Sequence, residues 1–236
     1  MKLSSTDRLF VLTGAGISAE SGLATFRGSG GLWNGHRVEE VATPEAWDAD
    51  PLLVWRFYSM RRRDALAVQP NAAHHALAQL EQQLGDRFYL CTQNVDDLHE
   101  RAGSHRIHHM HGSLFQSRCV RCNQPFADSA FYESAPLPTC TTCGSPIRPH
   151  IVWFGEIPLD MESIYAQLDR ATTLLVVGTS GSVYPAAGFV HIARQTGTRT
   201  IYIGPEEPSN AASFDDIILG TATQVLPDFF DHPSSK

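Results

Sequence analysis

The chain has 236 residues, of which 42% are hydrophobic and 18% charged, and its formal net charge is −7. This length suits one large domain with a smaller addition, and the composition is that of a folded globular protein. The acidic balance argues against nucleic acid as a partner. The apolar runs are too short to span a bilayer, and the first residues do not form a secretory signal. We therefore expect a cytoplasmic protein that does not bind membranes.

The chain alternates between short apolar runs and segments with helical spacing. The apolar runs predict strands over residues 8–13, 88–92, 106–110, 150–154, 173–178 and 200–204. The helical segments cover residues 51–68, 71–84, 96–102, 161–170 and 186–195. Strands that alternate with helices indicate an α/β fold whose parallel sheet is covered on both faces. Residues 117–148 have no such periodicity and are rich in cysteine and proline, so we expect an inserted module there.

A glycine-rich turn directly follows the first predicted strand. Residues 14–19 (GAGISA) fit the pattern G-x-G-x-x-[G/A] of dinucleotide-binding sheets, in which the glycines let the backbone approach a pyrophosphate at a helix N-terminus. A plain strand-to-helix turn is the alternative. The next residues are a polar loop over 22–35 and not a second strand with an acidic end, which leaves room for another pose of the dinucleotide. Arg27, in that loop, can pair with a phosphate.

Four of the five cysteines form two C-x-x-C pairs separated by 17 residues. Cys119, Cys122, Cys140 and Cys143 thus have the spacing of a tetrahedral zinc site. Four thiolates close the coordination shell and leave no position for water, so the zinc would be structural. Two disulfides, or a redox-active C-x-x-C pair, are the alternatives. Cys91, on a predicted strand, is expected to be a buried free thiol.

Polar or glycine-rich clusters follow three of the predicted strands. Gln93, Asn94 and Asp96 follow the second strand, and they can bind an amide or a ribose or simply cap the next helix. His111 follows the third and suits a general base near neutral pH, although the chain has eleven histidines. Residues 178–180 form a small Gly-Thr-Ser turn after a later strand. Because ligands of open α/β sheets bind at the carboxyl ends of strands, these clusters suggest one cleft.

Several motifs, taken in order, resemble the sirtuins, most closely their class III members of the bacterial CobB type. They span nearly the whole chain, and besides the cysteine pairs they are residues 14–27 (GAGISAESGLATFR), 92–99 (TQNVDDLH), 111–113 (HGS), 152–156 (VWFGE) and 178–180 (GTS). The resemblance implies a Rossmann-like, doubly wound sheet with a smaller inserted domain. It also implies an NAD-dependent protein lysine deacylase that holds one structural Zn²⁺.

The same resemblance implies how the reaction proceeds. The acyl oxygen attacks C1′ of the nicotinamide ribose, nicotinamide leaves, and water releases the free lysine and an O-acyl-ADP-ribose. His111 would be the general base on a ribose hydroxyl, and Asn94 and Asp96 would hold the nicotinamide-ribose end. These three, with fifteen others, would form the NAD site. The others are Gly14, Ala15, Gly16, Glu20, Thr25, Phe26, Arg27, Trp33, Gln93, Val95, Gly178, Thr179, Ser180, Gly204 and Ala222.

The acyl-lysine side of the site is also implied by the resemblance. Val152, Phe154 and Gly155 would border the acyl-lysine tunnel, with the peptide added as a strand. Tyr58 and Arg61 lie at i and i+3 on a predicted helix and match the Tyr-x-x-Arg motif of class III sirtuins, which prefer acidic acyl groups. A guanidinium can hold a carboxylate while a phenol donates to it, which favours succinyl and malonyl groups besides acetyl. The alternative is a charged helix face over residues 61–63 with Tyr58 in the core.

Two positions depart from the usual sirtuin pattern. Gly204 stands where sirtuins usually have an asparagine that contacts ribose, so that contact is lost or made by backbone. Thr25 replaces an aspartate of many deacetylases, as in class III.

The resemblance gives a discontinuous NAD-binding domain over residues 1–35, 71–112 and 149–236. The small domain combines a helical insertion over residues 36–70 with the zinc module over residues 113–148. We expect a monomer that acts on acylated lysines of other proteins. An NAD-dependent protein ADP-ribosyltransferase and a zinc-ribbon binding module are the alternatives.

Overall fold

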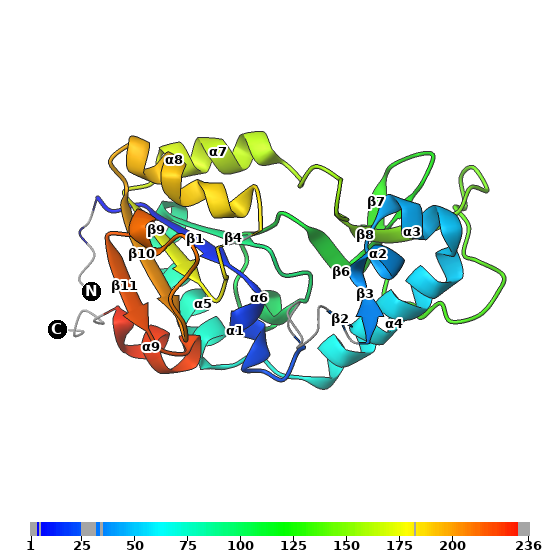
Figure 1. Ribbon diagram of the computed structural model, residues 1–236, viewed down its shortest axis with the longest axis horizontal. Helices are drawn as coiled ribbons and strands as arrows, with labels where there is room; N and C mark the ends of the chain where they lie inside the picture. Colours follow the sequence, from blue (N-terminus) through cyan, green and yellow to red (C-terminus); the bar gives the residue numbers. More distant parts are fainter. Residues whose placement is uncertain (1–3, 5, 25–31, 34, 182, 231–236) are drawn as a thin grey trace.

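The computed structural model describes residues 4, 6–24, 32–33, 35–181 and 183–230, and for residues 32 and 33 it describes the backbone alone. Two lobes lie side by side, a large one built on a parallel sheet and a small one that carries the four paired cysteines (Figure 1). Among the described residues, no helix is both long and apolar enough to cross a bilayer.

The large lobe contains a six-stranded sheet in which every neighbouring pair is parallel. Its spatial order is β11-β10-β9-β1-β4-β5. The bounds are β1 Leu9–Thr13, β4 Phe88–Thr92, β5 Ile107–His109, β9 Thr173–Val177, β10 Arg199–Gly204 and β11 Asp216–Leu219. The strands β4 and β5, which come next in the sheet after β1, lie on one side of it, and the later strands β9, β10 and β11 lie on the other side. The strand order therefore reverses between β1 and β9. This is the doubly wound, Rossmann-like arrangement that the sequence predicts.

Helices cover both faces of this sheet, and the alternation of side chains along β1 shows why. Leu9 and Val11 pack toward α5 and α9, whereas Phe10 and Leu12 pack toward α7 and α8. Both sets are buried because a parallel sheet between two helical layers has no solvent face. The helices of this lobe are α1 Ala15–Ala19, α5 Ala72–Leu84, α6 Leu98–Arg101, α7 Met161–Asp169, α8 Phe189–Gln195 and α9 Ala222–Phe229, with 3-10 turns at Gly85–Arg87, Ala186–Gly188 and Ala211–Ser213.

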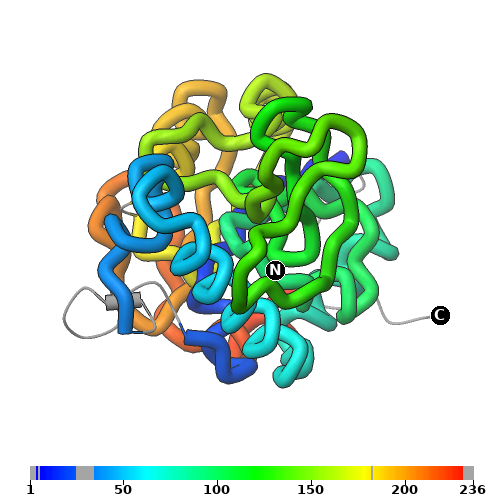
Figure 2. The backbone as a smooth tube through the Cα atoms, turned by 90° about the vertical axis from the view of Figure 1, so that its right-hand side faces the viewer, coloured from blue at the N-terminus to red at the C-terminus, as the bar shows by residue number. Residues whose placement is uncertain are grey.

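The small lobe joins two segments that are distant in the sequence. Figure 2 looks at this lobe and shows the blue-to-cyan residues 36–67 beside the green residues 112–151. The first segment holds α2 Val38–Val41, α3 Pro44–Ala49 and α4 Pro51–Ala67, and the second holds an antiparallel sheet of β6 Gly112–Cys119, β7 Pro125–Ala127 and β8 Ile147–Ile151. A short ribbon of β2 Leu32–Trp33 and β3 His36–Arg37 precedes them.

Two helices of the small lobe begin at a capping side chain followed by a proline. The Thr43 hydroxyl accepts the Ala46 N–H at 3.0 Å, and an Asp50 carboxylate oxygen accepts the Leu53 N–H at 2.9 Å. Each cap is followed by a proline at the first helical position, where no N–H is needed. The two caps set the entry of α4, the helix that carries Tyr58 and Arg61.

The three consecutive arginines of α4 have three different environments. Arg63 is exposed and pairs with Glu133 at 2.7 Å. Arg62 is fully buried and donates to the Leu114 carbonyl and to Asp128, which ties α4 to the antiparallel sheet. Arg61 is also buried, at the wall of the cavity described below. The alternative of one solvated charged face over residues 61–63 is therefore wrong.

The structure corrects one strand prediction and adds elements that the sequence analysis did not predict. The strand predicted over residues 150–154 is β8, which lies at Ile147–Ile151 and pairs antiparallel with β6 in the small lobe. A short apolar run indicates a strand but not its partner, and here the partner comes from the zinc module. The strand β6 crosses the domain boundary proposed between residues 112 and 113, and β8 crosses the one proposed between residues 148 and 149. The sequence reading also missed β11 and α9.

Candidate functional site

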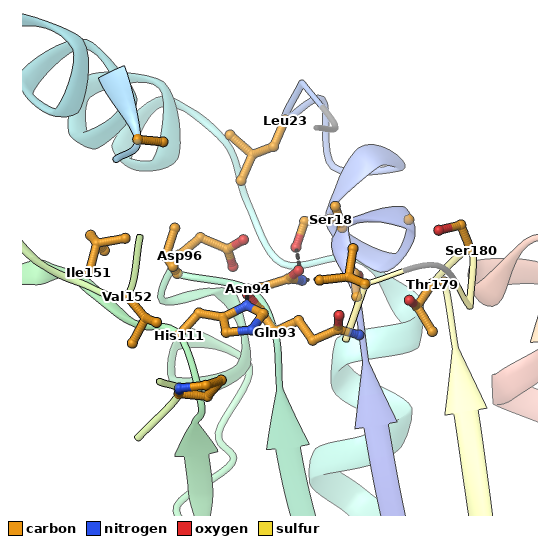
Figure 3. A pocket seen from close by; sticks show the side chains of 18 of the residues that line it. Ser18, Leu23, Gln93, Asn94, Asp96, His111, Ile151, Val152, Thr179 and Ser180 are labelled. Carbon is orange, nitrogen blue, oxygen red and sulfur yellow. Dashed lines mark hydrogen bonds between the residues drawn. The ribbon is translucent and has the colours of Figure 1, made fainter. Parts of the chain in front are cut away.

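A cavity of about 690 Å³ opens at the carboxyl ends of β1, β4, β9 and β10, between the two lobes. Figure 3 shows the sheet strands pointing toward it and labels ten of the residues around it. All three predicted clusters line it, so the expectation of one cleft is confirmed. The predicted site residues in its lining are Gly14, Ala15, Gly16, Tyr58, Arg61, Gln93, Asn94, Val95, Asp96, His111, Val152, Phe154, Gly155, Gly178, Thr179 and Ser180.

The glycine turn lies directly against the end of β9. The Gly16 N–H donates to the Gly178 carbonyl at 2.8 Å, and a Cβ at Gly16 would collide with the Gly178 backbone. A Cβ at Gly14 would collide with Thr179 and with the same carbonyl. Close approach of two backbones at the point where the strand order reverses thus explains these glycines, and it leaves a cradle for a nucleotide across β1 and β9.

Asn94 and Asp96 are buried behind this turn, on the loop after β4. The Asn94 amide donates to the Gly14 carbonyl at 3.1 Å and to the Ser18 hydroxyl at 3.0 Å, which locks the glycine turn to β4. Burial raises the pKa of Asp96, against the lowering effect of the Leu98 N–H that its carboxylate accepts. The Asx-turn alternative therefore holds in part for Asp96, although both residues also line the cavity.

Gln93 supplies an observation that points to a ligand. Its side-chain Nε2 is buried in the cavity wall and has no hydrogen-bond partner among the described residues. A buried unpaired amide is costly, and a bound molecule with an acceptor would satisfy it. The residues present therefore fit a nucleotide: a glycine cradle on one side and an unsatisfied donor on the other.

His111 follows β5 and lies at the cavity wall, with its ring between Gln93 and Val152 (Figure 3). Its Nδ1 is 3.0 Å from the Gln93 carbonyl oxygen. A carbonyl can only accept, so Nδ1 carries the hydrogen and Nε2 keeps its lone pair. Burial lowers the pKa of His111, only partly opposed by the Gln93 contact. The ring is thus a neutral base at pH 7.

The β10 end of the cavity contains residues that the sequence reading did not assign. Tyr202, Pro205 and Glu206 line it together with Thr179 and Ser180. Gly204 lies two residues beyond Tyr202 on the same face of β10, and a Cβ there would collide with the Tyr202 hydroxyl. The Tyr202 ring therefore occupies the space that a side chain at Gly204 would fill. The sequence signal that could have identified Tyr202 as a site residue is its position two residues before Gly204, on the same face of a predicted strand.

Other predicted NAD-site residues lie elsewhere or outside the described part. Glu20 accepts hydrogen bonds from the N–H and hydroxyl of Thr223, and Ala222 is buried in the core beside α5. Neither of them, nor Gly204, is part of the cavity lining. Thr25, Phe26 and Arg27 lie outside the described residues, as does the side chain of Trp33.

The small lobe provides the opposite wall. Tyr58 and Arg61 are both buried and project from one face of α4 into the cavity lining. Burial lowers the pKa of Arg61, against the nearby charges of Asp64 and Asp96. Val152 continues from β8, where its N–H donates to the His111 carbonyl at 2.9 Å. The predicted base and the predicted peptide-binding segment are thus joined by a backbone hydrogen bond.

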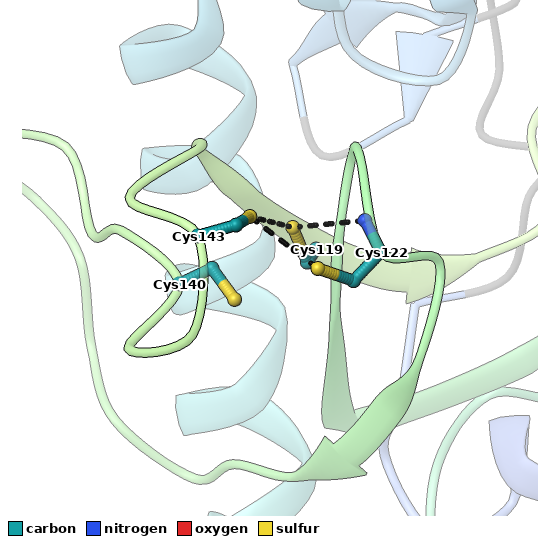
Figure 4. Close-up of side chains that lie close together, drawn as sticks. All are labelled: Cys119, Cys122, Cys140 and Cys143. Atoms are coloured by element: carbon teal, nitrogen blue, oxygen red, sulfur yellow. Dashed lines mark hydrogen bonds between the residues drawn. The ribbon is translucent and has the colours of Figure 1, made fainter.

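The four paired cysteines converge in the small lobe, where β6 ends at Cys119 (Figure 4). All are free thiols, and their Sγ atoms lie within 4.8 Å of one another. The Cys119 Sγ accepts the N–H groups of Arg121 and Cys122 at 3.3 Å, as a metal-bound thiolate would. With Zn–S near 2.3 Å, tetrahedral geometry needs sulfurs about 3.8 Å apart, which matches this cluster. The geometry fits a closed Cys₄ zinc site and not two disulfides. Cys91 is a buried free thiol, as predicted.

Comparison with known proteins identifies the family. The family model for the Sir2 family matches residues 14–185. The chain belongs to the Sir2 family. It is 50% identical to an NAD-dependent protein deacylase of Escherichia coli K12 over 228 residues, which are 95% of this chain and 81% of that protein. A Yersinia pestis protein of the same name is 50% identical over 93% of this chain and 80% of its own length.

Solved structures of this family share the fold and include nucleotide complexes. A Sir2 homologue in complex with NAD superposes with a TM-score of 0.86 at 44% identity, over 93% of this chain and 86% of that one. An ADP-ribose complex of a Sir2 homologue mutant gives a TM-score of 0.87 at 44% identity, over 93% and 88% of the two chains. The Sir2 fold, with its parallel sheet and cysteine cluster, is therefore that of this chain.

Proposed function

We propose that this Sir2 protein is an NAD-dependent protein lysine deacylase. The observation that carries the proposal is one continuous cavity, which joins the glycine turn of β1, the neutral imidazole of His111 and the segment after β8. A nucleotide and an extended peptide would meet there beside a base. The relatives named NAD-dependent protein deacylases and the NAD complex of a Sir2 homologue support the same activity.

NAD supplies a glycosidic carbon that an acyl oxygen can attack as nicotinamide leaves. The residues of this chain bind and orient the two substrates around that carbon. Gln93 donates its free amide hydrogen to the nucleotide, Asn94 keeps the glycine turn in place, and Asp96 closes the β4 side. His111 takes a proton at Nε2, because its Nδ1 hydrogen is held by the Gln93 carbonyl.

The acylated protein binds along the edge strand β8. The small sheet has the order β7-β6-β8, so β8 is an edge strand among the described residues, and an extended peptide can lie along its continuation at residues 152–155. The N–H groups of Val152, Trp153 and Phe154 already donate within the protein, so the peptide would pair with carbonyl groups of this segment. This placement brings the acylated lysine into the cavity next to His111. The acyl group then points toward α4.

Tyr58 and Arg61 select acidic acyl groups. A carboxylate at the end of a succinyl or malonyl chain can accept two hydrogen bonds from the Arg61 guanidinium and one from the Tyr58 phenol. The guanidinium is largely desolvated by burial, which strengthens its attraction for an anion. Acetyl-lysine lacks this carboxylate and gains nothing from the pair.

Arg61→Met tests the proposal against Arg63→Met, the exposed arginine two residues along the same helix. Hydrogen bonds to charged groups are worth about 1.5–3 kcal/mol, so kcat/KM for a succinyl-lysine peptide should fall about 10- to 150-fold in Arg61→Met. The fall for the matching acetyl-lysine peptide should be much smaller, and Arg63→Met should resemble wild type. Both peptides are incubated with NAD and all products are measured by mass. Equal losses on the two peptides contradict the acyl preference, and ADP-ribosylated peptide in place of free lysine contradicts deacylation.

A further inference from the structure

A buried hydrogen bond connects the segment after β8 to the predicted acyl-selecting helix. The Trp153 indole N–H donates to the Tyr58 hydroxyl oxygen at 3.0 Å, and both side chains are at most 2% exposed. Both residues line the cavity. Tyr58 and Trp153 are 95 positions apart in the chain, so this contact is made only by the fold.

The direction of this hydrogen bond is fixed by chemistry. An indole nitrogen can only donate, so the Tyr58 oxygen accepts and the phenolic hydrogen is not used in the bond. Burial raises the pKa of Tyr58 far above neutrality, so the phenol keeps that hydrogen at working pH. Rotation of the hydroxyl about its C–O bond is limited, because one lone pair must face the indole. The hydrogen is therefore presented in a restricted set of directions.

Trp153 is itself held by charged groups behind it. The Arg148 guanidinium stacks over the indole ring, with its central carbon 3.2 Å from the ring centroid. Arg148 is bound to both Glu156 oxygens at 2.7 and 2.9 Å, and Glu156 accepts the Trp153 backbone N–H at 2.8 Å. Arg118 adds a further contact to Glu156 at 3.0 Å. A cation over its face draws electron density from the indole and makes its N–H a stronger donor.

We infer that Trp153 is a positioning residue for acyl-group selection, whose indole N–H fixes the Tyr58 hydroxyl so that the phenolic hydrogen is donated to the carboxylate of an acidic acyl group. The inference rests on the proposed role of Tyr58 and Arg61. It adds a residue outside the Tyr-x-x-Arg motif and assigns its action to one hydrogen bond. Trp153 then matters for succinyl- and malonyl-lysine more than for acetyl-lysine.

The test replaces the N–H and keeps the ring. Trp153 is exchanged for β-(3-benzothienyl)alanine, which has the shape of tryptophan but a sulfur in place of N–H, and Trp153→Phe serves as a second variant. The expected result is an increase of about 2- to 10-fold in KM for a succinyl-lysine peptide, as the loss of one hydrogen bond implies. The change in KM for the acetyl-lysine peptide should be smaller, so the succinyl-to-acetyl ratio of kcat/KM falls.

Trp55 provides a matched control. It is a fully buried tryptophan of the same lobe, whose indole N–H donates to the Ile147 carbonyl at 3.1 Å and not to Tyr58. The same benzothienyl exchange at Trp55 removes a comparable hydrogen bond and should leave the succinyl-to-acetyl ratio at the wild-type value. Melting temperature and zinc content are measured for every variant, so that loss of folding is recognised.

A double-mutant cycle with Tyr58→Phe decides whether Trp153 acts through the phenol. With the hydroxyl already absent, the benzothienyl exchange at Trp153 should change the ratio by less than about twofold. A full effect in the Tyr58→Phe background would mean that Trp153 contacts the acyl chain itself, which overturns the inference. An unchanged ratio in the single exchange also overturns it. The proposed acyl selection itself is wrong if Arg61→Met leaves the succinyl-to-acetyl ratio of kcat/KM unchanged. The comparison of Arg61→Met with Arg63→Met therefore distinguishes failure of the proposed function from failure of this inference.

Discussion

The two lobes of this protein are stabilised in different ways. The large lobe buries aliphatic side chains on both faces of a parallel sheet, as along β1. The small lobe has a hydrophobic core that is rich in aromatic rings, and it buries charge in addition: Arg62 is fully buried among carbonyls and Asp128, and Arg148 stacks on Trp153. It also brings four cysteines together. The small lobe therefore combines a hydrophobic core with a metal site and buried, paired arginines, whereas the aliphatic side chains on the two faces of the sheet form the core of the large lobe.

The proposed functions follow the same division. The large lobe presents backbone and neutral polar groups to the nucleotide, and the small lobe presents Arg61 and Tyr58 to the acyl group. The following experiments separate the two lobes, beginning with the largest expected effect.

Zinc removal should unfold the small lobe selectively. A structural Cys₄ zinc contributes on the order of 10 kcal/mol of apparent binding free energy. Chelation, or Cys140→Ser, should therefore abolish hydrogen-exchange protection over residues 112–151 while β1, β4 and β9 stay protected. Cys91→Ala is the control, because Cys91 lies in the large-lobe sheet and away from the cluster. Uniform loss of protection across both lobes would contradict the division.

His111→Tyr should abolish turnover on every acyl substrate. Loss of a positioned general base costs about 100- to 10,000-fold, and the loss should be equal for acetyl and succinyl peptides. Zinc content and melting temperature should stay near wild type. A variant that loses only one of the two activities would contradict the assignment of His111 to the shared chemistry.

The pH dependence of the wild-type enzyme follows from the same residue. Burial lowers the pKa of His111 below 6.5, so the neutral base persists to lower pH than for a free histidine. The kcat/KM should therefore stay level from pH 8 down to 6.5 and fall only below that value. An acidic limb that begins above pH 6.5 would contradict the lowered pKa.

Gly204→Ala should disturb the β10 end of the cavity. The new Cβ collides with the Tyr202 hydroxyl, and overpacking typically costs about 1–3 kcal/mol of unfolding free energy. Binding of ADP-ribose, measured by calorimetry, should weaken severalfold. Tyr202→Leu, which removes the ring carbons at 2.7 and 2.9 Å as well as the hydroxyl, should relieve much of the loss in the double variant. Gly188→Ala is the control, because its Cβ meets only the Tyr184 ring at an ordinary 3.7 Å. Wild-type stability and ADP-ribose affinity in Gly204→Ala would show that the Tyr202 ring can move aside, which contradicts this prediction.

Much of the large lobe could be predicted because its signals are local. The apolar runs of β1, β4 and β9 and the spacing of α4 and α5 lie within single elements, and the strand-end clusters follow directly from them. The strand β8 was assigned to the wrong sheet, since an apolar run carries no information about its partner. The strand β11 was missed because its three consecutive apolar residues show no alternation. The helix α9 was missed although Ala222, Val225, Leu226 and Phe229 have helical spacing, because it is short and contains Pro227.

The sequence by itself determined the alternation of strands and helices, the glycine turn and the cysteine spacing, because each depends on neighbours a few residues away. Only the tertiary structure decided the separate environments of Arg61, Arg62 and Arg63, which are consecutive in the chain. It also decided that the Tyr202 ring fills the space above Gly204 and that Trp153 donates to Tyr58. These are questions of burial and of contact between distant segments, which side-chain packing settles and a linear pattern does not record.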